Sequence, residues 1–263
     1  TAEQFVARAY PAGEFSNSYN FQPFVWNVPE RATRNISVGL GYDLPWNISF
    51  EAALMAGRIQ SETHLAPSPA STAGDNDILV PAANYYNPFG PTTFNGVANP
   101  NRLANLVNVP TTGLALRLTT YRPVDTGPRV YEVTDDSYRL LAGLRGNKSG
   151  FDWETALVYS WAKTDDHTLN AISNTLFQQA LAKSTPDAYN PFNGGCIDNV
   201  GNGDCTPNPQ SSIDPFLISV FRKGKTTLAL ADFKVSNNSL FSLPGGDVGI
   251  AAGVEWRRET FID

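Results

Sequence analysis

The 263-residue sequence predicts an all-β fold, part of an antiparallel transmembrane β-barrel with long extracellular loops and a short loop helix. Three observations lead to this prediction. Apolar and polar residues alternate over runs well beyond the usual strand length of about five or six residues. The apolar faces of these runs begin or end with Trp, Phe or Tyr. Tight turns alternate with long polar connections, an asymmetry typical of outer-membrane barrels.

The first strand region is expected at about 33–62. Ile36 and Val38 alternate with Asn, Ser and Gly before a turn at 43–47, and the alternation resumes on the return strand at Ile48. An apolar face opposite a polar face is the pattern of a half-buried antiparallel strand. We therefore predict a hairpin in this region.

The second strand region is expected at about 113–163, with a tight turn at 146–150. The two main strands of this region pair with each other, which leaves the segment 114–121 without an assigned partner. It either pairs with 130–133 above the membrane or forms the upper part of the first main strand, with a bulge at Gly127 and Pro128. Both alternatives stay open from the sequence.

The third strand region is expected at about 219–262, with a turn at 243–247. Val254 and Trp256 share its apolar face, and charged residues alternate with them. In a barrel, such charges point into the lumen and are candidates for ligand contact. These lumen candidates are Arg139, Glu255, Arg257 and Glu259.

A soluble β-sandwich with one solvated face would produce the same alternation. An exported sandwich that serves as a binding or surface-structural protein, without a transport role, is therefore the alternative. Strand length and the asymmetry between turns and connections favour the barrel.

Two long segments, at about 61–113 and 165–213, are rich in Asn, Pro, Gly, Ser and Thr and lack strand alternation. Connections of this length are uncommon inside compact soluble domains. Helical spacing within the second segment predicts a short amphipathic helix. Its apolar positions are Leu169, Ile172, Leu176, Phe177, Ala180 and Leu181.

A short aromatic motif occurs once in each long segment. Tyr86-Asn-Pro-Phe89 in the first is repeated by Tyr189-Asn-Pro-Phe192 in the second. The four rings are candidates for ligand contact at the extracellular mouth. A structural turn anchored by the rings is the other reading, and we favour it, because Asn-Pro readily starts a turn.

The two cysteines, Cys196 and Cys205, are separated by a loop rich in Gly and Asn. In an oxidising compartment we expect a disulfide between them that closes this loop. The acidic and amide side chains of the 196–205 loop have the oxygen ligands that Ca²⁺ prefers, but their spacing misses the EF-hand pattern. We therefore expect no metal and no cofactor.

Composition and motifs weigh against two further classes of function. The chain carries 19 Lys and Arg against 25 Asp and Glu, a net charge of −6, and it has no cluster of basic residues. It is therefore a poor candidate for binding nucleic acid. We also expect no enzyme and no catalytic residues, because adjacent acidic pairs such as Asp135 and Asp136 usually cap turns or stay solvated, and no nucleophile, P-loop or zinc-protease motif occurs.

Several segments together resemble the barrel of TonB-dependent outer-membrane receptors, over most of 31–263. They are Gly127-Pro128-Arg129, the Tyr-Arg-Leu-Leu-Ala-Gly-Leu-Arg-Gly run at 138–146, the Phe-Asp-Trp-Glu run at 151–154, the two Tyr-Asn-Pro-Phe elements, and the run at 240–249 that leads into Gly-Val-Glu-Trp-Arg-Arg-Glu at 253–259.

This resemblance implies a 22-stranded barrel in the outer membrane of a Gram-negative bacterium, closed by an N-terminal plug. It implies active uptake of a scarce ligand (a siderophore, carbohydrate, vitamin or peptide) driven by TonB with ExbB and ExbD. Further partners would be outer-membrane lipid and lipopolysaccharide. We find no plug domain in the sequence and expect the chain to be the partial barrel region of such a receptor.

Overall fold

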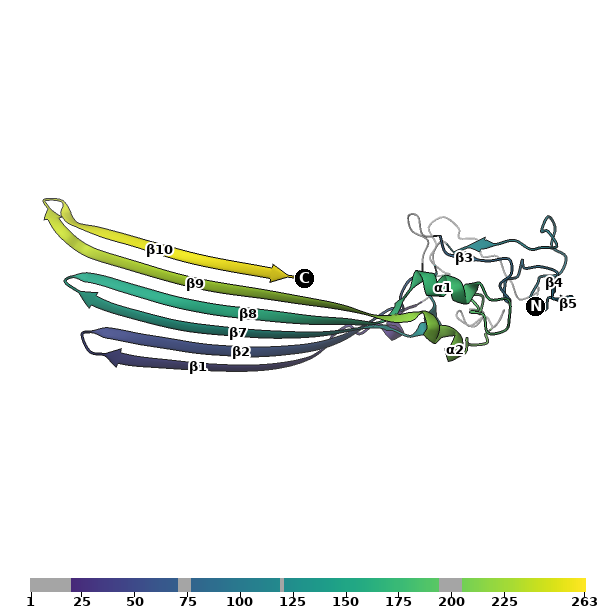
Figure 1. The fold of residues 1–263 in the computed structure, drawn as a ribbon, viewed down its shortest axis with the longest axis horizontal. Helices are drawn as coiled ribbons and strands as arrows, with labels where there is room; N and C mark the ends of the chain where they lie inside the picture. The colour runs from purple at the N-terminus through teal and green to yellow at the C-terminus, as the bar shows by residue number, and fades with distance from the viewer. Residues whose placement is uncertain (1–19, 71–76, 119–120, 194–204) are drawn as a thin grey trace. The chain divides into compact units, whose positions relative to one another are not determined.

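The computed structural model describes residues 20–70, 77–118, 121–193 and 205–263 (Figure 1). Its internal contacts divide the chain into two units. The sheet unit comprises Pro29–Glu62, Glu132–His167 and Phe221–Asp263, and the loop unit comprises Thr1–Val28, Thr63–Tyr131 and Thr168–Val220.

The largest sheet has six strands in the order β1-β2-β7-β8-β9-β10 (Figure 1). The strands are β1 (Glu30–Leu44), β2 (Ile48–Leu65), β7 (Arg129–Lys148), β8 (Phe151–Ile172), β9 (Leu217–Leu243) and β10 (Gly246–Ile262). These six strands are neighbours in the sheet in the order in which they follow along the chain, which makes the sheet an antiparallel meander. The predicted all-β, antiparallel class is therefore confirmed.

Three tight hairpins join β1 to β2, β7 to β8 and β9 to β10. In the first, two of the three turn residues, Trp46 and Asn47, have positive φ of 67° and 56°; in the second, both turn residues, Ser149 and Gly150, have positive φ of 55° and 80°. Turns of this kind match the right-handed twist of paired strands. The register between β1 and β2 then runs unbroken from the turn to Glu30 opposite Glu62.

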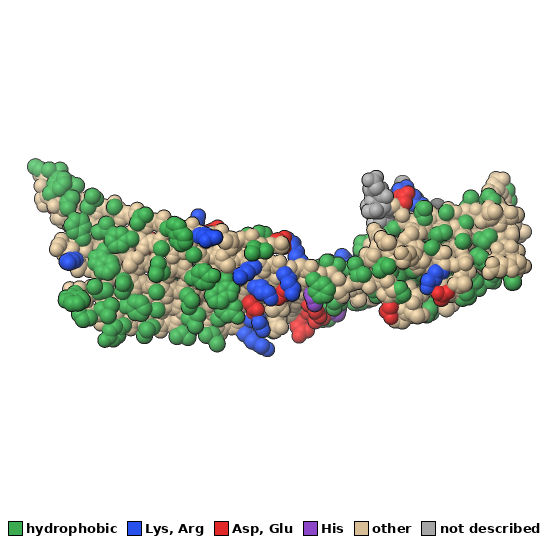
Figure 2. Space-filling view, in the orientation of Figure 1, with side chains coloured by type: hydrophobic (Ala, Val, Ile, Leu, Met, Phe, Trp, Pro, Cys, Tyr) green, Lys and Arg blue, Asp and Glu red, His purple; other side chains and the backbone are tan. Residues whose placement is uncertain are grey.

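The register assigns alternate residues to two faces of the sheet, because successive side chains of a strand point to opposite sides. Val38 lies opposite Leu54, and Val254 opposite Phe233, whereas Glu255 lies opposite Asp232. We call the side that carries Val38 and Val254 the apolar face and the other side the polar face. In Figure 2, hydrophobic side chains cover the strands beside the three hairpins.

The loop unit has its own small core. Its helices are α1 (Asn174–Leu181) and α2 (Gln210–Ile213), and its 3₁₀ turns are η2 (Gln22–Phe24), η3 (Val124–Thr126) and η4 (Asp214–Phe216). It also has two short antiparallel ladders: β3 (Leu79–Val80) pairs with β6 (Leu116–Arg117), and β4 (Thr93–Phe94) pairs with β5 (Val97–Ala98). Phe177, Tyr189 and Phe216 are fully buried and pack edge to face. No helix in the described parts of the chain is long and apolar enough to cross a membrane.

The predicted loop helix is shorter than its apolar spacing indicated. Leu169 and Ile172 belong to β8, and α1 begins only at Asn174. Ser173 is the N-cap, and its hydroxyl accepts a hydrogen bond from the Leu176 amide at 3.4 Å. The helix starts where the chain supplies this cap, because the first amides of a helix lack partners within it.

Both alternatives for segment 114–121 are wrong. Its strand β6 pairs with β3, and Tyr121 forms an isolated bridge with Ala70. The side chains of Leu116 and Leu118 pack against the loop core. Burial in that core, rather than extension of β7, therefore determines where this segment lies.

Candidate functional site

The polar face of the sheet carries charged side chains in ion pairs. Across β2 and β7, Arg145 lies 3.0 Å from Glu51, and across β8 and β9, Lys234 lies 3.0 Å from Glu154. All four side chains are more than half exposed. Each pair therefore adds little stability. Such a surface is wet and able to exchange partners, which suits contact with a polar ligand or a polar protein surface.

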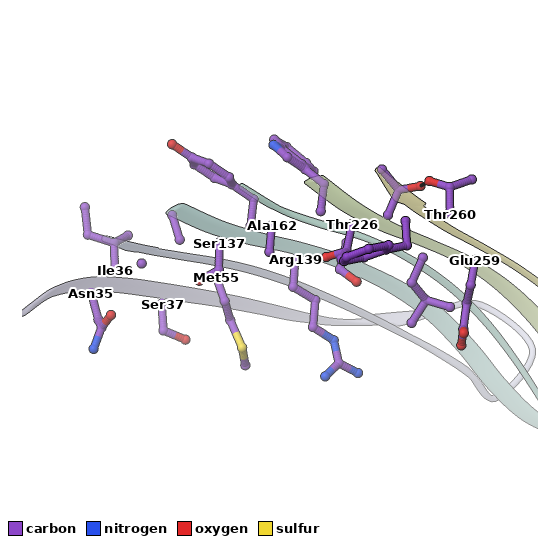
Figure 3. A pocket seen from close by; sticks show the side chains of 18 residues that line it. Asn35, Ile36, Ser37, Met55, Ser137, Arg139, Ala162, Thr226, Glu259 and Thr260 are labelled. Carbon is purple, nitrogen blue, oxygen red and sulfur yellow. Dashed lines mark hydrogen bonds between the residues drawn. The ribbon is translucent and has the colours of Figure 1, made fainter. Parts of the chain in front are cut away.

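A hollow of about 850 Å³ lies on this polar face and receives residues from all six strands (Figure 3). In Figure 3, Asn35, Met55, Arg139 and Glu259 project from the same side of the sheet, whereas Ile36, adjacent to Asn35, projects from the other. One cation and one carboxylate therefore border the same open space.

Small side chains make room for this hollow. Gly57 in β2 leaves room for its neighbours: a Cβ atom there would stand 2.8 Å from Asn35 Oδ1 and 3.1 Å from Ser137 Oγ, so these side chains would have to shift. Ser160 and Ala162 line the space from β8. The result is a surface with hydroxyl, amide, guanidinium and carboxylate groups, which can hydrogen-bond a polar ligand.

A second hollow, of about 880 Å³, lies nearer the hairpins on the same face. Ser49, Arg145, Glu154 and Lys234 line it. Asn147 beside it donates a hydrogen bond to Asp152 at 2.7 Å. The two hollows make the polar face a candidate binding surface along much of the sheet.

All four lumen candidates from the sequence lie on the polar face. Arg139 and Glu259 line the first hollow. Glu255 and Arg257 occupy the same face of β10, and Arg257 lies 3.5 Å from Glu259. Alternation alone located these residues, because strand geometry fixes which side each residue takes.

The aromatic candidates lie in the loop unit, where the two Asn-Pro elements form the same turn. The amide of Phe89 donates to Asn87 Oδ1 at 2.9 Å, and the amide of Phe192 donates to Asn190 Oδ1 at 2.9 Å. The Tyr86 hydroxyl donates to the carbonyl of Pro186 at 2.7 Å. These contacts support the structural reading, in which both the asparagine side chains and buried rings such as that of Tyr189 anchor the turns.

Asparagine side chains are the feature of the loop unit that the sequence reasoning missed. Asn84 and Asn87 are fully buried. Each accepts from a backbone amide two residues ahead and donates its NH₂ group to carbonyls of other segments, such as Leu181 and Leu114. Each amide thus joins one turn to a second segment. The high Asn content of the long segments is the sequence feature that could have indicated these buried amide contacts.

Tyr189 lies in the core of the loop unit with 0% exposure, so its ring offers no surface to a ligand in this structure. Its hydroxyl donates to Asp125 Oδ1 at 2.7 Å and lies 3.0 Å from the Tyr121 hydroxyl. Asn208 donates to the other Asp125 oxygen at 2.6 Å. Burial raises the pKa of both tyrosines well above the ordinary value, because it disfavours the charged form.

Cys205 is disulfide-bonded. Cys196, the other cysteine of the chain, lies outside the described residues, as does most of the loop in which Ca²⁺ binding was considered. Among the residues that the structure describes, no three His, Cys, Asp or Glu side chains cluster closely enough to hold a metal ion.

Comparison of the chain with protein-family models, curated proteins and solved structures finds no significant match. Functional inference therefore rests on the residues and their geometry.

Proposed function

We propose that the six-stranded sheet is a membrane-spanning part of an outer-membrane β-barrel receptor, which takes up a scarce polar ligand in a TonB-dependent manner. The observation that carries this proposal is the apolar face. Its large side chains are solvent-exposed in the structure: Ile36 by 64%, Leu157 by 60% and Val254 by 67%. A continuous exposed apolar surface indicates contact with another apolar phase or protein.

The dimensions of the apolar face suit a bilayer. On β8 the apolar band runs from Trp153 to Trp161, with Thr155 as its one polar residue, and on β10 it runs from Val248 to Trp256. Each run covers about nine residues, the length of a tilted transmembrane β-strand. Tyr138 and Trp161 stack at one boundary of this apolar band, with ring centroids 4.7 Å apart. Aromatic rings at the edges of an apolar band are typical of membrane interfaces.

Charged residues begin directly beyond the band. The next residue on the apolar face is Arg34 on β1, Arg58 on β2, Asp136 on β7, Lys163 on β8 and Arg258 on β10. Figure 2 shows Lys, Arg, Asp and Glu gathered at this level of the strands. A sharp change from apolar to charged side chains at one level supports an interface between hydrocarbon and lipid headgroups.

The edges of the sheet support a larger closed structure. β1 and β10 each pair with one neighbour only, and both are long. Unpaired edges of this length are costly inside a membrane, where backbone groups lack water. We infer that β1 and β10 pair with further strands to close a barrel. The sandwich alternative would need a second sheet that covers the whole apolar band.

The receptor role is supported by the polar face and the long connections. The two hollows with Arg139, Glu259 and the exposed ion pairs would face the lumen and contact ligand or a plug. The connections between β2 and β7 and between β8 and β9 would lie on the extracellular side, opposite the tight turns. TonB, ExbB and ExbD would act through a plug region of the full receptor.

A lipid-soluble photoprobe tests the membrane part of the proposal. Tyr159 and Trp161 lie on the apolar face and Ser160 on the polar face. In outer-membrane fractions, we expect the probe to label peptides through Tyr159 and Trp161, and absence of label would refute the membrane sheet. The receptor part predicts that the polypeptide containing this sequence in that fraction has a mass several times 28.6 kDa. A mass near 28.6 kDa would refute a 22-stranded receptor.

A further inference from the structure

The two hollows of the polar face differ in whether their charged side chains already have partners. Every charged side chain that lines the second hollow is paired: Arg145 with Glu51, Lys234 with Glu154, and Asp152 with Asn147. These contacts hold neighbouring strands and the second hairpin together. Among the residues that the structure describes, the second hollow therefore offers no unpaired charge to a ligand.

The first hollow is lined by unpaired hydrogen-bonding groups instead. In the described part of the chain, the Arg139 side chain makes no ion pair and no hydrogen bond. The same holds for the amide of Asn35 and for the hydroxyls of Ser37, Ser137 and Ser160. In Figure 3, Asn35, Ser37 and Arg139 project from one side of the sheet. These donors and acceptors are therefore available to a ligand in the hollow.

Arg139 differs from the other cations on the polar face of the interior strands of the sheet unit. Arg145 and Lys234 are paired as described above, and Arg222 donates a hydrogen bond to Asp263 at 2.7 Å. Arg139 belongs to β7, which already has a neighbouring strand on each side. Closure of the barrel would therefore give Arg139 no new strand as a neighbour, and its charge stays open to the hollow.

The carboxylate of the same hollow is too far away to pair with this arginine. Glu259 lies on β10 and is 3.5 Å from Arg257. Two strands, β8 and β9, separate β10 from β7. Because neighbouring strands lie about 4.8 Å apart, the backbones of Arg139 and Glu259 are about 14 Å apart along the sheet. The hollow thus presents one unpaired positive charge beside hydroxyl and amide groups.

This combination matches an organic acid that also carries hydroxyl groups. Arginine binds a carboxylate through two parallel hydrogen bonds. One guanidinium neutralises one negative charge, which suits a carboxylate better than a doubly charged phosphate. The volume of about 850 Å³ lies within the range of about 300–1,000 Å³ that is usual for small-molecule sites.

We propose that the first hollow binds a hydroxylated monocarboxylate, the chemistry of a sugar acid, with the carboxylate on Arg139. The hydroxyl groups of the ligand bond to Asn35, Ser137 and Ser160. The proposal names the ligand class of the receptor function proposed above and rests on that function.

The test uses the full receptor purified in detergent, with galacturonate as the probe. Saturation-transfer NMR at low ionic strength measures the affinity for galacturonate and for its methyl ester, which keeps the ring hydroxyls but lacks the charge. Arg139→Gln is compared with Arg34→Gln, which removes an arginine from the other face of the sheet. Ala162→Leu, which narrows the hollow, is compared with Ala142→Leu on the apolar face. Circular dichroism checks that each variant is folded.

We expect Arg139→Gln to lower the affinity for galacturonate about tenfold and to remove the preference for the acid over the ester, because a pair of charge-assisted hydrogen bonds is lost. Ala162→Leu should weaken the binding of both compounds. Arg34→Gln and Ala142→Leu should leave both affinities unchanged. Equal affinity of the wild type for acid and ester, or equal losses in Arg139→Gln and Arg34→Gln, would overturn the proposal.

Insertion into phosphatidylcholine vesicles, measured in parallel, separates this proposal from the receptor function. Wild-type protein that fails to insert would refute the membrane function itself. Protein that inserts but binds neither galacturonate nor its ester would refute the sugar-acid site and leave the membrane sheet standing.

Discussion

Tyr138 on β7 and Trp161 on β8 stack with ring centroids 4.7 Å apart and ring planes within 18° of parallel. Two residues further along the same face, Asp136 and Lys163 are charged. The stacked pair therefore marks the level at which the apolar band ends. On the opposite face at this level, Arg139 lines a polar hollow. The two surfaces of one sheet thus have different chemistry over the same strand residues.

An arginine in the middle of the apolar band should disrupt insertion. Leu157→Arg is expected to cost about 2–4 kcal/mol in folding free energy, because the charge would enter the hydrocarbon core. Its neighbour Val158→Arg, on the polar face, should cost much less. Urea titration of folding into vesicles measures both.

If the sheet lay in water instead, Leu157, which is 60% exposed in the structure, would be an ordinary surface residue. Substitutions on a surface surrounded by water usually change stability by no more than about 0.5 kcal/mol. A change of that size for Leu157→Arg would therefore contradict a sheet that lies in lipid.

The core of the loop unit should depend on the Tyr189 hydroxyl, which donates to Asp125. Tyr189→Phe should destabilise the loop unit by about 1–3 kcal/mol, because a partly buried carboxylate loses a hydrogen bond. Tyr86→Phe is the control, since its hydrogen bond to Pro186 is exposed. Limited proteolysis reports on both variants. Equal protease sensitivity of the two would contradict a central role for Tyr189.

Alkaline pH should weaken the same core. Burial raises the folded-state pKa of Tyr121 and Tyr189. Their contribution to stability is therefore complete below the ordinary tyrosine pKa of about 10. It is lost as the pH rises through the folded-state values, because the unfolded chain then releases protons that the folded chain retains. Tyrosinate absorbance should show two delayed ionisations, which the Tyr121→Phe/Tyr189→Phe double variant lacks. Identical titration curves would show that these hydroxyls are not buried.

Two substitutions in the hairpin turns should change stability in opposite directions. Asn47 has a φ of 56°, and Gly150 has a φ of 80°. Glycine adopts such angles without strain, so Asn47→Gly should stabilise the first hairpin by up to about 1 kcal/mol. Gly150→Ala should destabilise the second hairpin by about 1 kcal/mol or more, because alanine is strained at a positive φ. Free energies of unfolding measure the two effects. If both substitutions changed the free energy of unfolding in the same direction, the positive φ angles of the turns would not determine hairpin stability.

The sequence predicted the strands near the hairpins well, because there each strand separates an apolar from a polar face. It underestimated the length of β8, which extends to Ile172 although this strand region was expected to end at about 163. The start of α1 was misplaced, because the spacing of Leu169 and Ile172 fits a helix as well as the end of a strand. Local patterns do not distinguish these two outcomes when strand pairing decides between them.

The polar face was predicted residue by residue, since Arg139, Glu255, Arg257 and Glu259 follow from alternation alone. The hollows within it were not, because their space comes from small residues on neighbouring strands, such as Gly57, whose register a single sequence does not reveal. The loop core was also missed. Its contacts join residues far apart in sequence, such as Tyr189 and Asp125, 64 residues apart.

The membrane orientation of the sheet is tested most directly by spin labels placed on neighbouring residues of β8. Leu157 and Tyr159 lie on the apolar face, and Val158 and Ser160 on the polar face. In reconstituted protein, we predict that labels at 157 and 159 are accessible to oxygen and shielded from a water-soluble nickel complex, and that labels at 158 and 160 show the reverse. Water accessibility at all four positions would contradict a membrane-spanning sheet.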